Sequence, residues 1–186
     1  MNIPVKLKNE ILKILDQSDL EREGSHGENT LYWVKKIKPD ASLSLQISAL
    51  AHDIERGVAP RYKSGDFEDH GEYKKVHSEK GAKIIGKILE KHNIDNKTID
   101  EVKELVRLHE TGGNVNADIL MDADSISFFD NNLEFYYSYK GLEGTLRQID
   151  YKFKRCSPRA QKHIKSLKVY QSFKKKLNTK LNHYTS

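Results

Sequence analysis

Apolar residues recur every three or four positions along most of this chain, which is the spacing of one face of an α-helix. Between positions 5 and 15, for example, Leu7, Ile11 and Leu15 fall on a single stripe. Comparable stripes predict helices over 5–15, 25–37, 43–57, 73–92, 98–109, 116–128, 142–154 and 164–177. No alternating pattern longer than a few residues indicates a β-strand, so the sequence predicts an all-α fold.

Residues that favour helix ends divide these stripes. Ser-His-Gly-Glu at 25–28 and Thr-Ile-Asp-Glu at 98–101 have the spacing of a capping box, which predicts that helices start at both. Ser157 before Pro158 predicts a third start, as a cap followed by a first-turn proline. The stretch 57–71 has no helical period, and a loop of this length inside a domain is a candidate lid over a site.

The composition is that of a folded protein. There are 186 residues, 37% hydrophobic and 32% charged, which suits one domain with an appendage. The single cysteine, Cys156, excludes a disulfide within the chain and fits a reducing compartment. No run of about 18 apolar residues occurs, and positions 1–10 lack the apolar segment of a signal peptide. We therefore expect a cytoplasmic protein with no membrane partner.

Charge divides the chain into two parts. Residues 140–186 hold 13 basic and 2 acidic side chains, whereas residues 1–139 hold 19 basic and 25 acidic ones. We predict a helical domain over 1–140 and a basic helical extension over 141–186 that packs on it. Such an extension can bind nucleic acid. We favour a solvated helix surface, because Tyr170 and Phe173 fall on the apolar stripe and leave no aromatic face for stacking bases.

Six ionisable residues fall at or near the apolar faces of five separate predicted helices. A lone inward histidine is usually hydrogen-bonded core, and a lone inward aspartate is usually a cap or half of an ion pair. Burying several of them in one small domain without a cation would be costly. Imidazole and carboxylate ligands together suit Mn, Fe, Co, Ni or Zn, and suit Mg less well. The six are His26, His52, Asp53, His77, His109 and Asp124.

The order of these residues resembles the HD superfamily of metal-dependent phosphohydrolases. In that family a histidine, a His-Asp doublet and a late aspartate bind one divalent metal inside a helical bundle. Here the resemblance covers about residues 20–135, and Ala-Asp-Ser-Ile at 123–126 matches the family's Ala-Asp-x-(Leu/Ile). It implies an HD-type bundle with a metal held by His26, His52, Asp53 and Asp124, and it favours Asp124 over Asp122 as the late ligand.

The resemblance also implies an activity. We expect hydrolysis of a phosphate ester of a nucleotide or another small phosphorylated metabolite. A phosphodiesterase acting on cyclic or oligonucleotides is the alternative within enzymes. A metal-bound module without turnover and a nucleic-acid-binding protein are the alternatives outside enzymes. Steeply salt-dependent RNA or DNA binding would distinguish the last of these.

Further residues are candidates for contacts with substrate. Arg56 returns to the helix face of the doublet, and Arg61 and Lys63 lie in the presumed lid, so all three are expected to bind phosphate. His77 and His109 occupy positions that some family members use for a second metal or for phosphate. We favour phosphate, because the sequence offers no clear carboxylate to complete a second cage.

The catalytic roles fall to carboxylates near the ligands. Asp53 is a ligand and a catalytic candidate, and Glu55 or Asp122 is a candidate general base or a residue that orients a ligand histidine. Glu110, which follows a candidate ligand, has the same two roles open to it. Three cations of the basic extension, Lys152, Arg155 and Arg159, are candidates to fold back over the site.

Overall fold

The computed structural model describes residues 2–19, 22–62 and 64–184, and within these ranges it contains helices and no β-strand. The all-α bundle predicted from the sequence is confirmed. In chain order the elements are α1 (Val5–Leu15), α2 (Glu23–Ile37), α3 (Leu43–Ala51), η1 (Ile54–Gly57), η2 (Ser64–Asp66), α4 (His70–Lys91), α5 (Asn96–Leu108), α6 (Val115–Ser127), η3 (Phe128–Asn132), α7 (Leu133–Lys154), α8 (Pro158–Ser166) and α9 (Lys168–Tyr184).

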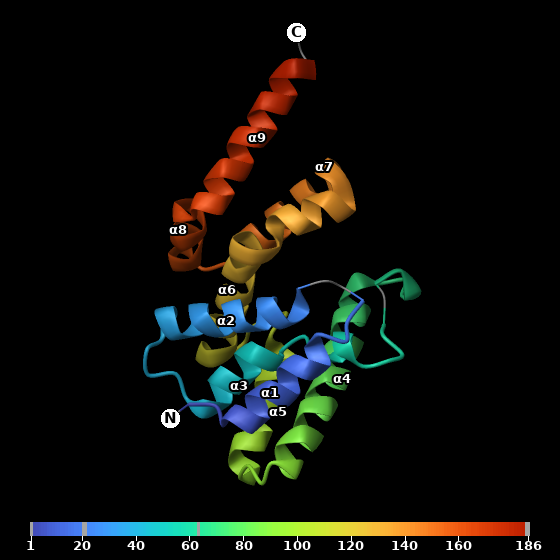
Figure 1. Cartoon of the computed structure of the whole chain (residues 1–186), viewed down its shortest axis with the longest axis vertical. Helices are drawn as coiled ribbons and strands as arrows, with labels where there is room; N and C mark the ends of the chain where they lie inside the picture. The colour runs from blue at the N-terminus through green and yellow to red at the C-terminus, as the bar shows by residue number, and fades with distance from the viewer. Residues whose placement is uncertain (1, 20–21, 63, 185–186) are drawn as a thin grey trace.

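Helix α3 lies at the centre of the bundle, where it contacts α1, α2, α5 and α6 (Figure 1). Its residues from Ser44 to Ala51 are all buried, because apolar side chains from the surrounding helices cover it on every side. Burial of each large apolar side chain stabilises the fold by about 1.5–3 kcal/mol. The α-helix ends at Ala51 rather than at Gly57 as predicted, and the chain continues in the 3-10 turn η1. The interior therefore receives the residues that directly follow α3.

Helix α2 begins before the predicted start at Ser25. Its first residue is Glu23, and Arg22 precedes it with a φ of 76°. Ser25 lies inside the helix, where its hydroxyl donates to the Arg22 carbonyl at 3.0 Å instead of capping an amide. At Gly27 a Cβ would lie 2.4 Å from the Leu50 carbonyl oxygen, so glycine permits the close packing of α2 on α3.

The remaining predicted ends are partly correct. Asp95, rather than Thr98, caps α5, because the Asp95 carboxylate accepts from the Thr98 amide at 3.0 Å. Ser157 caps α8 as predicted and accepts from the Ala160 amide at 3.2 Å. The single last helix predicted over 164–177 is wrong, since the extended backbone at Leu167 separates α8 from α9.

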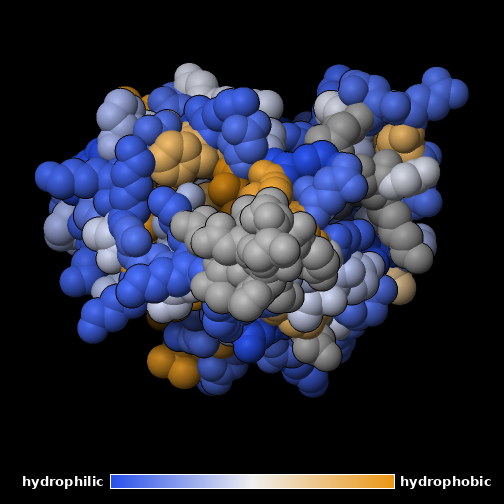
Figure 2. Space-filling model, turned by 90° about the horizontal axis from the view of Figure 1, so that it is seen from above, coloured by the Kyte–Doolittle hydropathy of each residue, from blue (hydrophilic) through white to orange (hydrophobic). Residues whose placement is uncertain are grey.

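The C-terminal helices pack on the bundle and then extend away from it. Helix α7 is interrupted at Gly141, whose φ of 67° and ψ of −171° are not helical, next to the predicted boundary at 140. Beyond this break, Thr145 and Lys152 are buried, and Tyr170 of α9 contacts the Phe129 ring with centroids 5.0 Å apart. Figure 1 shows α9 leading the chain away from the other helices. Hydrophilic residues dominate the face seen from that end (Figure 2). No described helix is long and apolar enough to cross a membrane.

Candidate metal centre

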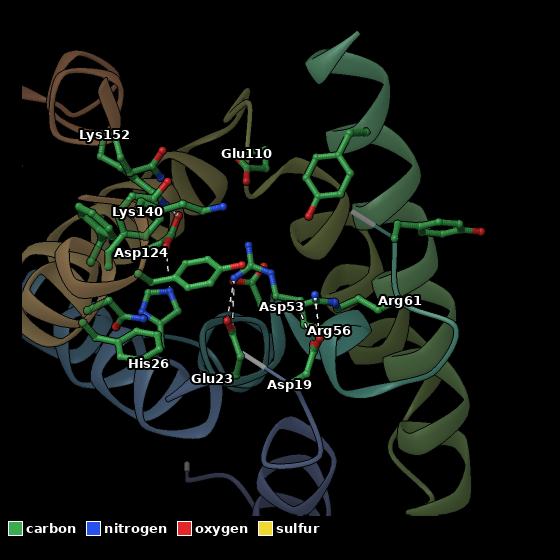
Figure 3. A pocket seen from close by; sticks show the side chains of 18 of the residues that line it. Asp19, Glu23, His26, Asp53, Arg56, Arg61, Glu110, Asp124, Lys140 and Lys152 are labelled. Carbon is green, nitrogen blue, oxygen red and sulfur yellow. Dashed lines mark hydrogen bonds and ion pairs between the residues drawn. The ribbon is translucent and has the colours of Figure 1, made fainter. Parts of the chain in front are cut away.

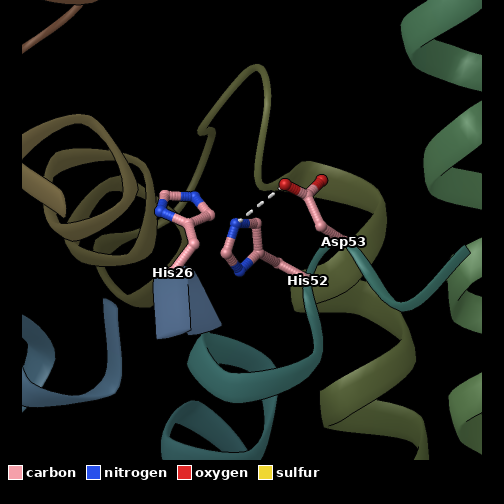
Figure 4. A group of neighbouring side chains, drawn as sticks. All are labelled: His26, His52 and Asp53. Atoms are coloured by element: carbon pink, nitrogen blue, oxygen red, sulfur yellow. Dashed lines mark ion pairs between the residues drawn. The ribbon is translucent and has the colours of Figure 1, made fainter. Parts of the chain in front are cut away.

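The six ionisable residues predicted to share the interior do so. Their exposed fractions lie between 1% and 4%. They come from five different helical segments: His26 from α2, His52 and Asp53 from the end of α3, His77 from α4, His109 from the end of α5, and Asp124 from α6. Figure 4 shows the His26 and His52 rings beside each other, with Asp53 next to His52.

In all four histidines the Nδ1 atom forms a hydrogen bond with a neighbouring oxygen. The partners of His26, His52, His77 and His109 are, in that order, Ser127 Oγ at 2.9 Å, the Ala49 carbonyl at 3.0 Å, Glu55 Oε2 at 2.9 Å and the Val106 carbonyl at 2.7 Å. A carbonyl can only accept, so His52 and His109 carry a proton on Nδ1. Partners of this kind orient the histidine ligands of metals and fix their tautomer.

The Nε2 atoms point to two aspartates. His26 Nε2 lies 3.1 Å from Asp124 Oδ1, and His52 Nε2 lies 3.3 Å from Asp53 Oδ2 and 3.7 Å from Asp124 Oδ1. His77 Nε2 is 3.0 Å and His109 Nε2 3.7 Å from Asp53 Oδ1. Asp53 therefore lies between the two pairs of histidines.

Two groups of atoms in the described chain are arranged as metal ligands would be. In each group the ligand atoms lie within 4.8 Å of one another: one contains His26, His52 and Asp53, and the other contains Asp53, His77 and His109. Asp124 joins the first group through its contacts with both histidines. The sequence offered no additional carboxylate for the second group. In the structure this group uses the carboxylate of Asp53, which also belongs to the first group.

These residues fit a divalent transition-metal ion. The Nε2 atoms of His52 and His109 are buried and have no hydrogen-bond partner. In the neutral Nδ1–H tautomer each Nε2 lone pair faces a carboxylate oxygen, an unfavourable contact unless a cation or a proton lies between them. A mixed imidazole and carboxylate set suits Mn, Fe, Co, Ni or Zn.

Three residues of the cluster have the ionisation state of metal ligands. Burial lowers the pKa of His109 to about 4, so its ring is neutral at pH 7. Burial opposes ionisation of Asp53, but the Arg56 guanidinium, 2.7 Å away, and His52 hold the pKa of this carboxyl well below its usual range. For Asp124, burial is likewise overcome by neighbouring cations, which keep its pKa well below the usual range.

A family model described as a domain of unknown function, DUF4202, matches residues 9–177. The chain belongs to the DUF4202 family. No curated protein and no solved structure matches it. The DUF4202 match spans the helical bundle and most of the basic extension, so every residue of the candidate centre lies within the family's domain.

Glu55 hydrogen-bonds to a histidine of the cluster and is not among the residues that line the cavity. It is fully buried, and its Oε2 accepts from His77 Nδ1. Its Oε1 accepts from the Tyr62 amide and from Lys80 Nζ, both at 3.2 Å. Burial lowers the pKa of His77, but hydrogen bonds to Asp53 and Glu55 raise it to about 9. Of the two roles predicted for Glu55, its contacts support positioning rather than proton transfer.

Cations surround the carboxylates of the site. Arg56, a predicted phosphate contact, pairs with Asp53 and with Glu23 at 3.1 Å. Two cations of the extension also reach the site: Lys152 Nζ lies 2.6 Å from Asp124 Oδ2, and Arg155 contacts the same oxygen. Arg159, the third cation considered, is exposed on α8.

Three other predicted residues lie elsewhere. Asp122, a candidate base, does not enter the cluster, because its carboxylate faces α8, where it accepts from the Ser157 amide at 2.8 Å and from the Ser157 hydroxyl. Arg61 lies at the cavity rim and pairs with Asp19 at 2.9 Å. Lys63 is outside the described residues.

A cavity of about 440 Å³ adjoins the cluster, which is within the range of small-molecule sites (Figure 3). Its lining includes ligand candidates His26, Asp53 and Asp124, together with Glu110. Most of the other lining residues are cations or aromatic residues: Arg56, Arg61, Lys140, Lys152, Tyr62, Tyr73, Phe128, Phe135, Tyr136 and Tyr139. The loop proposed as a lid contributes to this lining through Arg61, Tyr62 and Gly65.

Two residues that support the site escaped sequence reasoning. Glu23 forms an ion pair with Arg56, and the Ser127 hydroxyl forms a hydrogen bond with His26. Each lies three positions from a ligand candidate on the same helix, Glu23 before His26 and Ser127 after Asp124. Residues three positions apart share a helix face, so this spacing is the sequence feature that could have indicated their place beside the ligand candidates.

Proposed function

We propose that this chain is a metal-dependent phosphohydrolase acting on a nucleotide or another small phosphorylated metabolite. The observation that supports the proposal most directly is that the Nε2 atoms of four histidines converge on Asp53 and Asp124. Two of these Nε2 atoms are buried and have no hydrogen-bond partner. The order of these residues in the chain, which resembles the HD superfamily, supports the same activity. The cavity beside them has the size for a small substrate.

We infer that His26, His52, Asp53 and Asp124 hold one divalent ion. A bound divalent ion supplies a Lewis acid for the phosphoryl group and lowers the pKa of a coordinated water. Asp53, His77 and His109 form the site of a second ion, a role that the distances favour over the direct phosphate contact expected from the sequence. Arg56 keeps Asp53 ionised, and Glu55 orients the His77 ring.

The test combines metal analysis with a substrate screen. The purified protein is stripped with a chelator, reloaded with Mn, Fe, Co, Ni, Zn or Mg in separate samples, and assayed for phosphate release over a panel of phosphorylated metabolites. His52→Ala should lose bound metal and phosphate release. The matched control is His92→Ala, because this histidine follows the last residue of α4, 15 residues after His77, and pairs with Glu10 at 2.8 Å.

Two results would contradict the proposal. The first is full metal content and full activity in both His52→Ala and Asp53→Ala. The second is a wild-type protein that binds none of these metals. The number of ions is tested separately, since His109→Ala should lower the metal content from about two ions per chain to one while leaving the first group intact.

A further inference from the structure

The basic extension reaches the candidate centre through one carboxylate. Lys152 and Arg155 lie on consecutive turns near the end of α7, and both contact Asp124 Oδ2. The other oxygen of Asp124 faces His26 and His52. Two cationic side chains therefore contact one oxygen of Asp124, and the candidate histidine ligands contact its other oxygen.

The two cations are held very differently. Arg155 also donates to Ser125 Oγ at 2.8 Å, to Glu110 Oε2 at 2.7 Å and to the Tyr151 hydroxyl at 3.2 Å, so its guanidinium is anchored on several sides. Lys152 Nζ contacts only Asp124 among the described residues. An ammonium group has three donor hydrogens. Two donors of Lys152 are therefore free for another acceptor.

Lys152 is buried, yet it faces the cavity. Its exposed fraction is 8%, and it lines the same hollow as Asp53, Asp124 and Arg56 (Figure 3). A buried ammonium with unused donors is costly unless a further partner arrives. Since Arg155 already neutralises Asp124, Lys152 can leave that carboxylate without exposing an unpaired charge.

The balance of charge around the site specifies the partner. Five described carboxylates lie in the candidate centre or contact its residues, and each has the nitrogen of a lysine or arginine within 4 Å. Glu23 and Asp53 pair with Arg56, Glu55 with Lys80, Glu110 with Lys74 and Arg155, and Asp124 with Lys152 and Arg155. The five carboxylates are matched by five cations. Each divalent ion therefore adds two positive charges that only an incoming anion can balance.

We propose that Lys152 binds the phosphoryl oxygens of the substrate, and that the substrate is a phosphomonoester. This inference rests on the proposed hydrolytic function. A phosphomonoester dianion carries two negative charges and three terminal oxygens, one charge and one oxygen more than a diester. It therefore offsets more of the charge of the bound ions than a diester monoanion does, and its additional oxygen can accept from the free donors of Lys152. The extension thus supplies a substrate-binding residue to a metal centre built by the bundle.

Calorimetric titration of the full-length protein tests the proposal without a turnover assay. Metal-loaded protein is titrated with inorganic phosphate and, separately, with dimethyl phosphate, a diester monoanion. Lys152→Met should weaken phosphate binding by about tenfold to a hundredfold, the range for a hydrogen bond to a charged group. Its affinity for the metal should be equal to that of wild type or higher, because Asp124 loses a competing cation.

Two further variants control for charge and folding. Lys154→Met removes the same charge from the same helix, but Lys154 is exposed and pairs with Asp150 at 2.7 Å, so phosphate binding should be unchanged. Lys152→Arg keeps the charge and should retain most of the phosphate affinity. Thermal unfolding of each variant checks that the fold is intact.

The outcomes separate this inference from the function on which it rests. Wild-type phosphate affinity in Lys152→Met would overturn the role of Lys152 and leave the metal centre standing. Reduced metal affinity in the same variant would also overturn it, since Lys152 would then only hold Asp124 in place. Equal wild-type affinity for dimethyl phosphate would overturn the monoester assignment. A wild-type protein that binds no metal would overturn the proposed function and this inference together.

Discussion

Replacing Glu55 by Gln distinguishes a positioning role from a catalytic one. Glu55 Oε2 accepts the Nδ1 proton of His77, which leaves His77 Nε2 directed at Asp53. Glu55 Oε1 accepts from the Tyr62 amide and from Lys80, so the single oxygen of a glutamine would stay on that side and its NH2 would face His77 Nδ1. His77 would then have to accept at Nδ1 and carry its proton on Nε2. That tautomer cannot bind a cation through Nε2. The substitution therefore removes a ligand without touching any of the ligand residues.

The expected size of the effect follows from this contact. Loss of a residue that orients a metal ligand typically lowers metal affinity by about 10–100-fold, which is about 1.4–2.8 kcal/mol. The metal-free fold should also lose about 1 kcal/mol for each Glu55 bond that is no longer charge-assisted. For a chain of this size, each kcal/mol lowers Tm by roughly 2–4 °C.

The assay measures metal affinity and turnover in the same samples. Chelator-treated Glu55→Gln protein is titrated with Mn²⁺ by calorimetry, and phosphate release is followed as the metal concentration rises. Affinity should fall, and kcat should recover at saturating metal. The matched control is Glu79→Gln, two residues after His77 on α4, where the carboxylate pairs with Arg107 at the surface. Its metal affinity should equal that of wild type.

The opposite pattern would refute this reasoning. A general base typically contributes about 10²–10⁴-fold to the rate, and that loss would persist however much metal is added. Unchanged Mn²⁺ affinity together with a large deficit in kcat at saturating metal would therefore assign Glu55 to proton transfer, and would show that it does not orient His77.

Three other predictions follow from the structure. Asp124→Ala should abolish metal binding, and equal metal loss in Asp122→Ala would contradict this. Asp122→Ala should keep its metal and lose about 1–2 kcal/mol of stability, because its contacts at the start of α8 are removed. His77 has its pKa raised from 6.5 to about 9, so the stability it contributes to the metal-free protein is full below pH 6.5 and declines as pH rises to 9. Denaturant unfolding in chelator should show this decline in wild type and not in His77→Gln. Truncation after Cys156 removes α8 and α9 and uncovers buried Phe129, so the product should aggregate or melt earlier; a stable, active product that no longer retards RNA would favour a nucleic-acid arm instead.

The sequence alone determined the helical class of the fold and the identity of the residues in the cluster. Apolar spacing is a local property, and it located nearly every helix, with errors mainly at helix ends. The six ionisable residues could be selected because each occupied an inward position where burial of an unpaired charge is costly. Their chain order then indicated a metal site.

Tertiary structure alone decided which neighbours complete the site. Whether Glu55 turns to His77 or to the cavity depends on how η1 packs against α4. That the Asp122 carboxylate binds Ser157 at the start of α8 depends on how α8 packs against α6. Lys152 is about a hundred residues from His52 in the chain, and no local pattern reports that the turn back after Gly141 brings it to Asp124. Helix periodicity specifies which face is buried. Which buried faces meet is set by the packing of the whole bundle.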